Sequence, residues 1–212
     1  MIDRPDQARR YGELIDGEGR RLGDMVEQIL QFAGLSAPRS LAIRPVNVAA
    51  LIRELVASCE PLCRDARVRV DVDIDGPAPL AAADPESLRT ALQNLVANAI
   101  KHGASGGWVR VAVCTISGGV FPVVRIDVAD GGRGISAEDL PHVFEPFYRG
   151  RYAVYRQLRG NGLGLALVKR IAEAHRGAVS VQSAADHGAT FTLDIPAAST
   201  LHDRPAHQVA FS

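Results

Sequence analysis

The sequence predicts an α+β fold, a mixed sheet of about five strands with helices on one face, preceded by a long N-terminal helix. Some segments alternate apolar and polar residues, as half-buried strands do, and others repeat apolar residues at helical spacing. Two pairs of strands, over 108–130 and 179–195, are joined by short turns and predict antiparallel hairpins. This arrangement differs from a doubly wound parallel sheet.

Residues 7–35 predict one helix with an apolar stripe, weakened by four internal glycines. We expect this helix to need a partner helix, because its stripe has no other cover. The segment "GLSAPRS", with Gly34 and Pro38, then predicts the end of the helix and a domain boundary. The chain is therefore divided into an N-terminal helix and linker at 1–38, a main domain at 39–197 and a flexible tail at 198–212.

The elements of the main domain show no internal repeat. In chain order we expect a strand at 41–46, a helix at 47–66, a strand at 68–74, a helix at 84–103, strands at 108–116 and 123–130, a helix at 163–176 and strands at 179–183 and 189–195. Asp84 and Pro85 are typical of a helix start, and Gly103 of a helix end. Residues 131–160 have no period, and so long a loop within a domain is usually functional or disordered.

The bulk composition excludes several classes of protein. A formal net charge of +0 gives no overall basic field for nucleic acid or an anionic membrane. No apolar run approaches the ~20 residues of a membrane span. Three cysteines argue against a disulfide framework, and Cys59 and Cys63 are interpreted as core or boundary thiols. These observations predict a cytoplasmic protein, or the soluble part of a larger one.

Polar residues form a stripe on the helix predicted at 84–103. Asn94, Asn98, Lys101 and His102 share one face of the segment "NLVANAIKH". Asn is a poor helix former, so two of them in mid-helix suggest a function. An amide oxygen suits Mg²⁺ and an ammonium group suits phosphate. The alternative is an ordinary solvated face.

A carboxylate ends the strand predicted at 123–130. Asp130 has the same parity as the apolar residues of this strand, so it points to the buried side. A buried carboxylate needs a hydrogen-bond partner, and an adenine amino group is a suitable one. The glycines that follow, in "DGGRGI", would let a base approach the backbone. The alternative is that Asp-Gly simply makes a turn.

Two further motifs lie later in the chain. The segment "FEPFYRG" places aromatic residues and an arginine in a loop, where they bind in a pocket or form a small apolar cluster. The stretch "RGNGLGLAL" fits neither the dinucleotide fingerprint nor the P-loop pattern. A helix N-terminus attracts anions, so the stretch predicts either a phosphate contact or a flexible hinge.

Together, the segments "NLVANAIKH", "DGGRGI", "FEPFYRG", "GNGLGLAL" and "GATF" resemble the N box, glycine boxes, F box and terminal element of sensor histidine kinases. The resemblance implies the Bergerat fold of the GHKL ATPases, with ATP and Mg²⁺ as cofactors. It implies that Asn98 binds Mg²⁺ and that Asn98 and Lys101 are the catalytic residues. It implies that the nucleotide is bound by Asn94, Asn98, Lys101, His102, Asp130, Gly132, Gly134, Ile135, Phe144, Phe147, Arg149, Gly160, Gly162, Leu163, Gly164, Leu165 and Thr190.

The resemblance also assigns individual roles. Lys101 would contact phosphate, His102 would line the nucleotide, and Asp130 would bind adenine, with Thr190 near the base. Three glycines, Gly160, Gly162 and Gly164, would hinge a lid over ATP, and backbone N–H groups at 162–165 would face phosphate.

No histidine of the chain has the context of a phosphoacceptor. Residues 7–35 resemble the second helix of the family's dimerisation and phosphotransfer hairpin. The implied partners are therefore a phosphoacceptor helix, located upstream or in another chain, a response regulator and a second copy of the full-length protein, with no nucleic acid. The alternatives are an anti-sigma-type serine kinase and an inactive ATP-binding regulatory module.

Overall fold

The computed structural model describes residues 9–12, 15–17, 19, 23, 26, 41–76, 79–119, 121–151 and 160–201. The chain divides into two compact units, 1–39 and 40–212. In the first unit, the described residues are helical and exposed, and the rest of the helix predicted at 7–35 lies outside the described residues. The fold below is that of the second unit.

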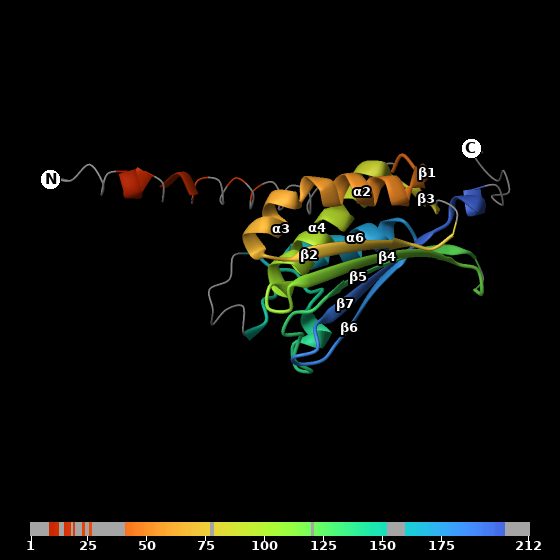
Figure 1. Ribbon diagram of the computed structural model, residues 1–212. Helices are drawn as coiled ribbons and strands as arrows, with labels where there is room; N and C mark the ends of the chain where they lie inside the picture. Colours follow the sequence, from red (N-terminus) through yellow and green to blue (C-terminus); the bar gives the residue numbers. More distant parts are fainter. Residues whose placement is uncertain are drawn as a thin grey trace, which may run out of the picture. The chain divides into compact units, whose positions relative to one another are not determined.

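A mixed sheet with the strand order β2-β4-β5-β7-β6 forms the body of this unit (Figure 1). Its strands are β2 (Arg69–Ile74), β4 (Trp108–Ile116), β5 (Val123–Asp130), β6 (Ala178–Ser183) and β7 (Ala189–Pro196). The hairpins β4–β5 and β6–β7 are antiparallel, as predicted, and β2 pairs with β4 in parallel. Buried and less buried residues alternate along β5 and β7, so one face of the sheet is the core face.

The helices cover that face alone, as Figure 1 shows. They are α2 (Val48–Ser58), α3 (Glu60–Ala66), α4 (Pro85–Gly103) and α6 (Gly164–Ala174). The predicted start of α4 is confirmed, because the Asp84 side chain accepts a hydrogen bond from Ser87 N at 2.9 Å. The core side of α4 is fully buried at Leu88, Leu92 and Leu95, so its polar stripe lies beside the core.

The single helix predicted at 47–66 is wrong in one respect. It is divided at Cys59 into α2 and α3. It begins at the predicted position, where the Asn47 side chain caps α2 by accepting from Ala50 N at 2.9 Å. Pro61 follows at the start of α3 and has no N–H with which to continue the helical pattern.

A second, two-stranded sheet pairs β1 (Arg44–Asn47) with β3 (Leu80–Ala83). The prediction omitted β3, because its alanine-rich sequence lacks the β-branched and aromatic residues of a strand signal. The prediction of a flexible tail at 198–212 is wrong for its first residues. η2 (Ala198–Leu201) is a 3₁₀ helix, and Ala197 and Ala198 are buried. Among the described residues, no helix has both the length and the apolar character needed to cross a membrane.

Candidate functional site

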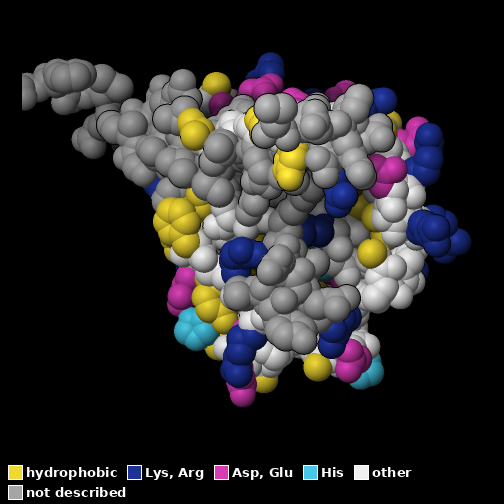
Figure 2. Space-filling view, turned by 90° about the vertical axis from the view of Figure 1, so that its left-hand side faces the viewer, with side chains coloured by type: hydrophobic (Ala, Val, Ile, Leu, Met, Phe, Trp, Pro, Cys, Tyr) yellow, Lys and Arg dark blue, Asp and Glu magenta, His cyan; other side chains and the backbone are white. Residues whose placement is uncertain are grey.

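The predicted polar residues meet at one end of the sheet, where α4 and β5 end and α6 begins. Two glycines of the second glycine box approach α4 closely. A Cβ placed on Gly164 would lie 2.7 Å from Asn94 Oδ1, and one on Gly160 would lie 3.2 Å from Lys101 Nζ. Figure 2 looks onto this end, and Lys and Arg side chains gather on it.

The two asparagines of α4 differ in their hydrogen bonds. Asn94 Nδ2 donates to Thr90 O, one turn back, at 2.9 Å. The Asn94 amide oxygen is therefore the atom turned towards Gly164. Asn98 is half-buried one turn further on, and its side chain makes no hydrogen bond to another described residue. Its amide oxygen is available to a ligand.

Positive charge is concentrated at the end of α4. The pKa of Lys101 is lowered, first by partial burial of the ammonium group and second by the charge of Arg149. Arg149 belongs to the predicted F box, so α4 and the loop after β5 bring two like charges together. An anion between these groups would stabilise both charged forms.

His102 is neutral in this environment. Its pKa is lowered from 6.5 to about 4, first by burial and second by the neighbouring Lys101 charge. The imidazole therefore presents a neutral aromatic edge beside the ammonium group, as a residue lining a nucleotide would.

Asp130 is buried, with 4% of its surface exposed, and it ends β5 on the core face as predicted. Its Oδ1 accepts a hydrogen bond from Gly132 N at 2.8 Å. Burial raises the pKa of this carboxyl group, while the N–H groups of Gly132 and Ala189 act to lower it. A carboxylate accepts several hydrogen bonds, so Asp130 can still receive one from a bound amino group.

The first glycine box packs tightly on its surroundings. A Cβ on Gly132 would overlap His102 O, and Gly134 has φ +69° against Ala184 and Gly188. Ile135 N donates to Ser183 Oγ at 2.8 Å. Ser183 is a site residue that the sequence does not predict, because its partner lies 48 positions away and no local pattern reveals the contact.

The aromatic residues of the F box do not share one pocket. Phe144 packs edge-on against Phe191 of the core, with ring centroids 6.3 Å apart. Phe147 is 64% exposed and has φ +65°, and its N–H donates to Gly162 O at 2.9 Å. The F box therefore holds the second glycine box through its backbone, while the Phe147 ring faces outward.

The second glycine box leads directly into α6. Gly162 has φ +74°, and Leu163 is buried as the N-cap residue without a side-chain cap. Leu163 N donates to Asn161 Oδ1 at 3.1 Å, and Leu165 is half-buried in the first turn. An uncapped helix start offers N–H groups and a partial positive charge to an anion. Residues 152–159, which belong to the predicted lid, lie outside the described residues.

Thr190 is not where the prediction put it. In the β5–β7 register Asp130 lies opposite Ala189, and Thr190 lies opposite Ala129. Neighbouring residues of a strand point to opposite faces, so Thr190 lies on the face away from Asp130, beside Gln182 of β6. Ala189, opposite Asp130, lies on the core face.

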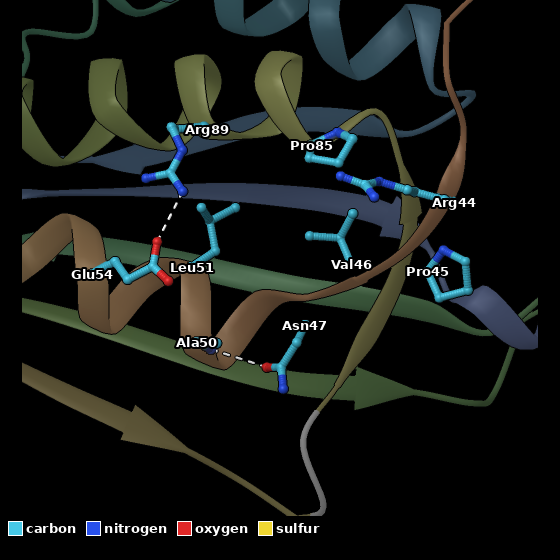
Figure 3. A pocket seen from close by; sticks show the side chains of 9 residues that line it. All are labelled: Arg44, Pro45, Val46, Asn47, Ala50, Leu51, Glu54, Pro85 and Arg89. Atoms are coloured by element: carbon cyan, nitrogen blue, oxygen red, sulfur yellow. Dashed lines mark hydrogen bonds and ion pairs between the residues drawn. The ribbon is translucent and has the colours of Figure 1, made fainter.

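A separate pocket of about 240 Å³ lies at the other end of α4 (Figure 3). Arg89 and Glu54 form an ion pair of 2.9 Å at its wall. The pocket contains none of the predicted site residues. It is lined by Arg44, Pro45, Val46, Asn47, Ala50, Leu51, Glu54, Pro85 and Arg89.

Comparison with known protein families identifies the family of this domain. Residues 83–199, more than half of the chain, match the histidine kinase-, DNA gyrase B- and HSP90-like ATPases. The chain belongs to this family. The matched range runs from the end of β3 to η2, so it includes every segment that meets at the site. The resemblance to the ATP-binding domain of sensor histidine kinases is confirmed.

Sensor kinases are prominent among the sequence relatives. Sensor-like histidine kinase SenX3 of Mycobacterium tuberculosis is 36% identical over 197 residues, which cover 92% of this chain and 47% of that protein. Signal transduction histidine-protein kinase AfsQ2 of Streptomyces coelicolor is 37% identical over 186 residues, covering 86% and 32%. The chain thus spans about half, or less, of the length of these relatives, and it corresponds to their ATP-binding catalytic part.

Solved structures confirm the predicted fold. The crystal structure of full-length ShkA in complex with AMPPNP has a TM-score of 0.76 at 31% identity, covering 89% of this chain and 38% of that chain. Histidine kinase AdeS of Acinetobacter baumannii has a TM-score of 0.70 at 21% identity, covering 92% and 87%, and supports the fold alone. The α+β fold of the HATPase domain is therefore present here.

Proposed function

We propose that this chain binds Mg²⁺-ATP at the end of the sheet and transfers the γ-phosphoryl group to a histidine that lies outside it. The observation that carries the proposal is that positively charged groups and a buried carboxylate lie on two sides of one site. Lys101 and Arg149 lie with the uncapped start of α6 on one side, and the buried carboxylate of Asp130 lies on the other. The first side fits phosphates and the second fits an adenine amino group.

A magnesium ion fits the residues present. Among the described residues no group of three or more His, Cys, Asp or Glu side chains could hold a metal by itself. Mg²⁺ keeps several waters and commonly binds through one or two protein oxygens together with substrate phosphates. Asn98 supplies such an oxygen from α4, next to the positive charges. The ion would neutralise charge on the phosphates.

The residues of the chain act by positioning and by charge neutralisation. Asp130 fixes the base and so orients the nucleotide along the site. Lys101 and the N–H groups at the start of α6 hold the phosphate oxygens on which charge develops during transfer. His102 remains neutral and lines the site without adding a further cation. A histidine imidazole approaching in line would then receive the phosphoryl group.

The first experiment measures ATP affinity by calorimetry for the native chain and for Asp130→Asn. The substitution replaces a charged acceptor, so we expect a loss of about 1.5–3 kcal/mol, or roughly 10- to 150-fold in Kd. Asp127→Asn is the matched control, because Asp127 lies on β5 but faces the other side of the sheet, where it accepts from Thr192. Equal ATP affinity in native and Asp130→Asn protein would contradict the site.

The second experiment tests the acceptor. The chain is mixed with Mg²⁺-ATP and a separately produced phosphoacceptor helix of a sensor kinase, and the acid stability of the product is measured. Phosphohistidine is lost in acid, whereas an acid-stable product would indicate a serine kinase. ATP binding without any transfer would favour a regulatory module. We propose a response regulator as the next acceptor, and dimerisation through the phosphotransfer helices of the full-length protein.

A further inference from the structure

The turn between α4 and β4, "GASGGW" at 103–108, packs directly against the first glycine box. Its own backbone is closed by Gly106 N and Gly107 N, which both donate to Gly103 O at 3.0 Å. A Cβ on Gly106 would lie 2.7 Å from Gly131 Cα and would overlap the Gly131 carbonyl group. The two backbones are therefore in contact without any side chain between them.

Trp108 covers the other side of the same peptide. A Cβ on Gly131 would lie 2.6 Å from Trp108 Cε2 and within the indole ring system. Gly131 N also donates to Trp108 O at 3.2 Å. Gly131 is thus held between the Gly106 backbone and the Trp108 ring, although 40% of Trp108 remains exposed.

The packing of Gly131 affects the positions of the residues before and after it. Asp130 precedes it, and a Cβ on Gly103 would lie 3.1 Å from Asp130 Cβ. Gly132 follows it and donates its N–H to the Asp130 carboxylate at 2.8 Å. A shift of Gly131 would therefore move both the carboxylate and the N–H group that orients it.

We propose that Trp108 is a positioning residue of the adenine subsite, holding Gly131 in place so that the Asp130 carboxylate meets the amino group of the base. The proposal rests on the proposed function. Trp108 acts through the Gly131 backbone, next to Asp130. Removing the ring should weaken the hydrogen bond between Asp130 and the base, while the Lys101 side keeps its geometry.

The test is a cycle that combines one protein change with one ligand change. ATP and purine riboside triphosphate, which lacks the 6-amino group, are titrated into the native chain and into Trp108→Ala. We expect Trp108→Ala to weaken the binding of ATP about tenfold, or 1.4 kcal/mol. The binding of the analogue should weaken about twofold or less, because the analogue has no amino group and makes no hydrogen bond to Asp130 that could be lost. Trp108→Phe keeps an aromatic ring and should stay within about threefold of native affinity.

Ile116→Ala is the matched control, because Ile116 is a large exposed apolar residue on the same strand and the same face, at its far end. It should leave both affinities unchanged. The urea midpoint of each variant shows whether it is folded. If Trp108→Ala does not fold, Trp108→Phe tests the proposal, because any affinity that it loses must again be lost for ATP and not for the analogue.

Three results would overturn the proposal. They are equal weakening of ATP and the analogue, native ATP affinity in Trp108→Ala, and a tenfold loss in Ile116→Ala. If the native chain itself binds no ATP, the proposed function fails as well. If it binds ATP but the cycle shows no coupling, only the role of Trp108 fails.

Discussion

The half-buried imidazole of His102 makes the stability of this domain depend on pH. Its pKa is about 4 in the folded chain, and 6.5 is the ordinary value that applies after unfolding. The unfolded chain therefore takes up a proton first as the pH falls. The contribution of His102 to stability is complete above pH 6.5 and is lost progressively down to about pH 4. The difference corresponds to roughly 3 kcal/mol in full, of which about 2 kcal/mol is lost between pH 7.5 and 5.

Urea unfolding followed by circular dichroism at pH 7.5 and pH 5 measures this loss. The native chain is compared with His102→Gln, which cannot take up the proton, and with His187→Gln, which removes an exposed histidine. We expect the loss of stability on acidification to be about 2 kcal/mol smaller in His102→Gln than in the other two proteins. Burial raises the pKa of Asp130, so Asp130 favours the folded state at lower pH, but this effect is common to all three and cancels. Equal pH dependence in all three proteins would refute the reasoning.

The structure predicts how three other substitutions change stability or ATP affinity. His175→Phe should lower the free energy of unfolding by about 1–3 kcal/mol in urea titrations, because His175 is buried and Asp84 N, which donates to its Nε2 at 3.0 Å, would lose its acceptor. Phe147→Gly should raise the thermal midpoint, since Phe147 is exposed and relief of its positive φ is worth about 1 kcal/mol. Gly164→Ala should weaken ATP binding in calorimetry without unfolding the chain, because its Cβ would lie 2.7 Å from Asn94 Oδ1.

Much of this fold is readable from the sequence because its signals are local. The start of α4 follows from a capping carboxylate and a proline at Asp84 and Pro85, and both act within one turn. The orientation of Asp130 follows from its parity with the apolar residues of β5, and the structure confirms its burial. The two hairpins follow from short turns between alternating segments.

The features that escaped prediction depend on contacts between distant segments. β3 is a strand because β1 supplies its partner, and alanines alone carry no such signal. Ser183 reaches Ile135 only in the folded sheet. Residue parity along β7 places Ala189 on the core face with Phe191, and it places Thr190 on the other face. A motif match alone does not carry that parity.

The two halves of the site are joined more closely than their separation in sequence suggests. The Gly132 backbone packs on His102 O, and His102 directly follows Lys101 at the end of α4. Without a nucleotide, the Lys101 and Arg149 charges oppose each other on one side, and burial disfavours the Asp130 carboxylate on the other. A ligand with phosphates at one end and an amino group at the other relieves both costs at once. A ligand that satisfies only one side leaves the cost of the other side in place, so the proposed site favours ATP over a ligand with phosphates alone or an amino group alone.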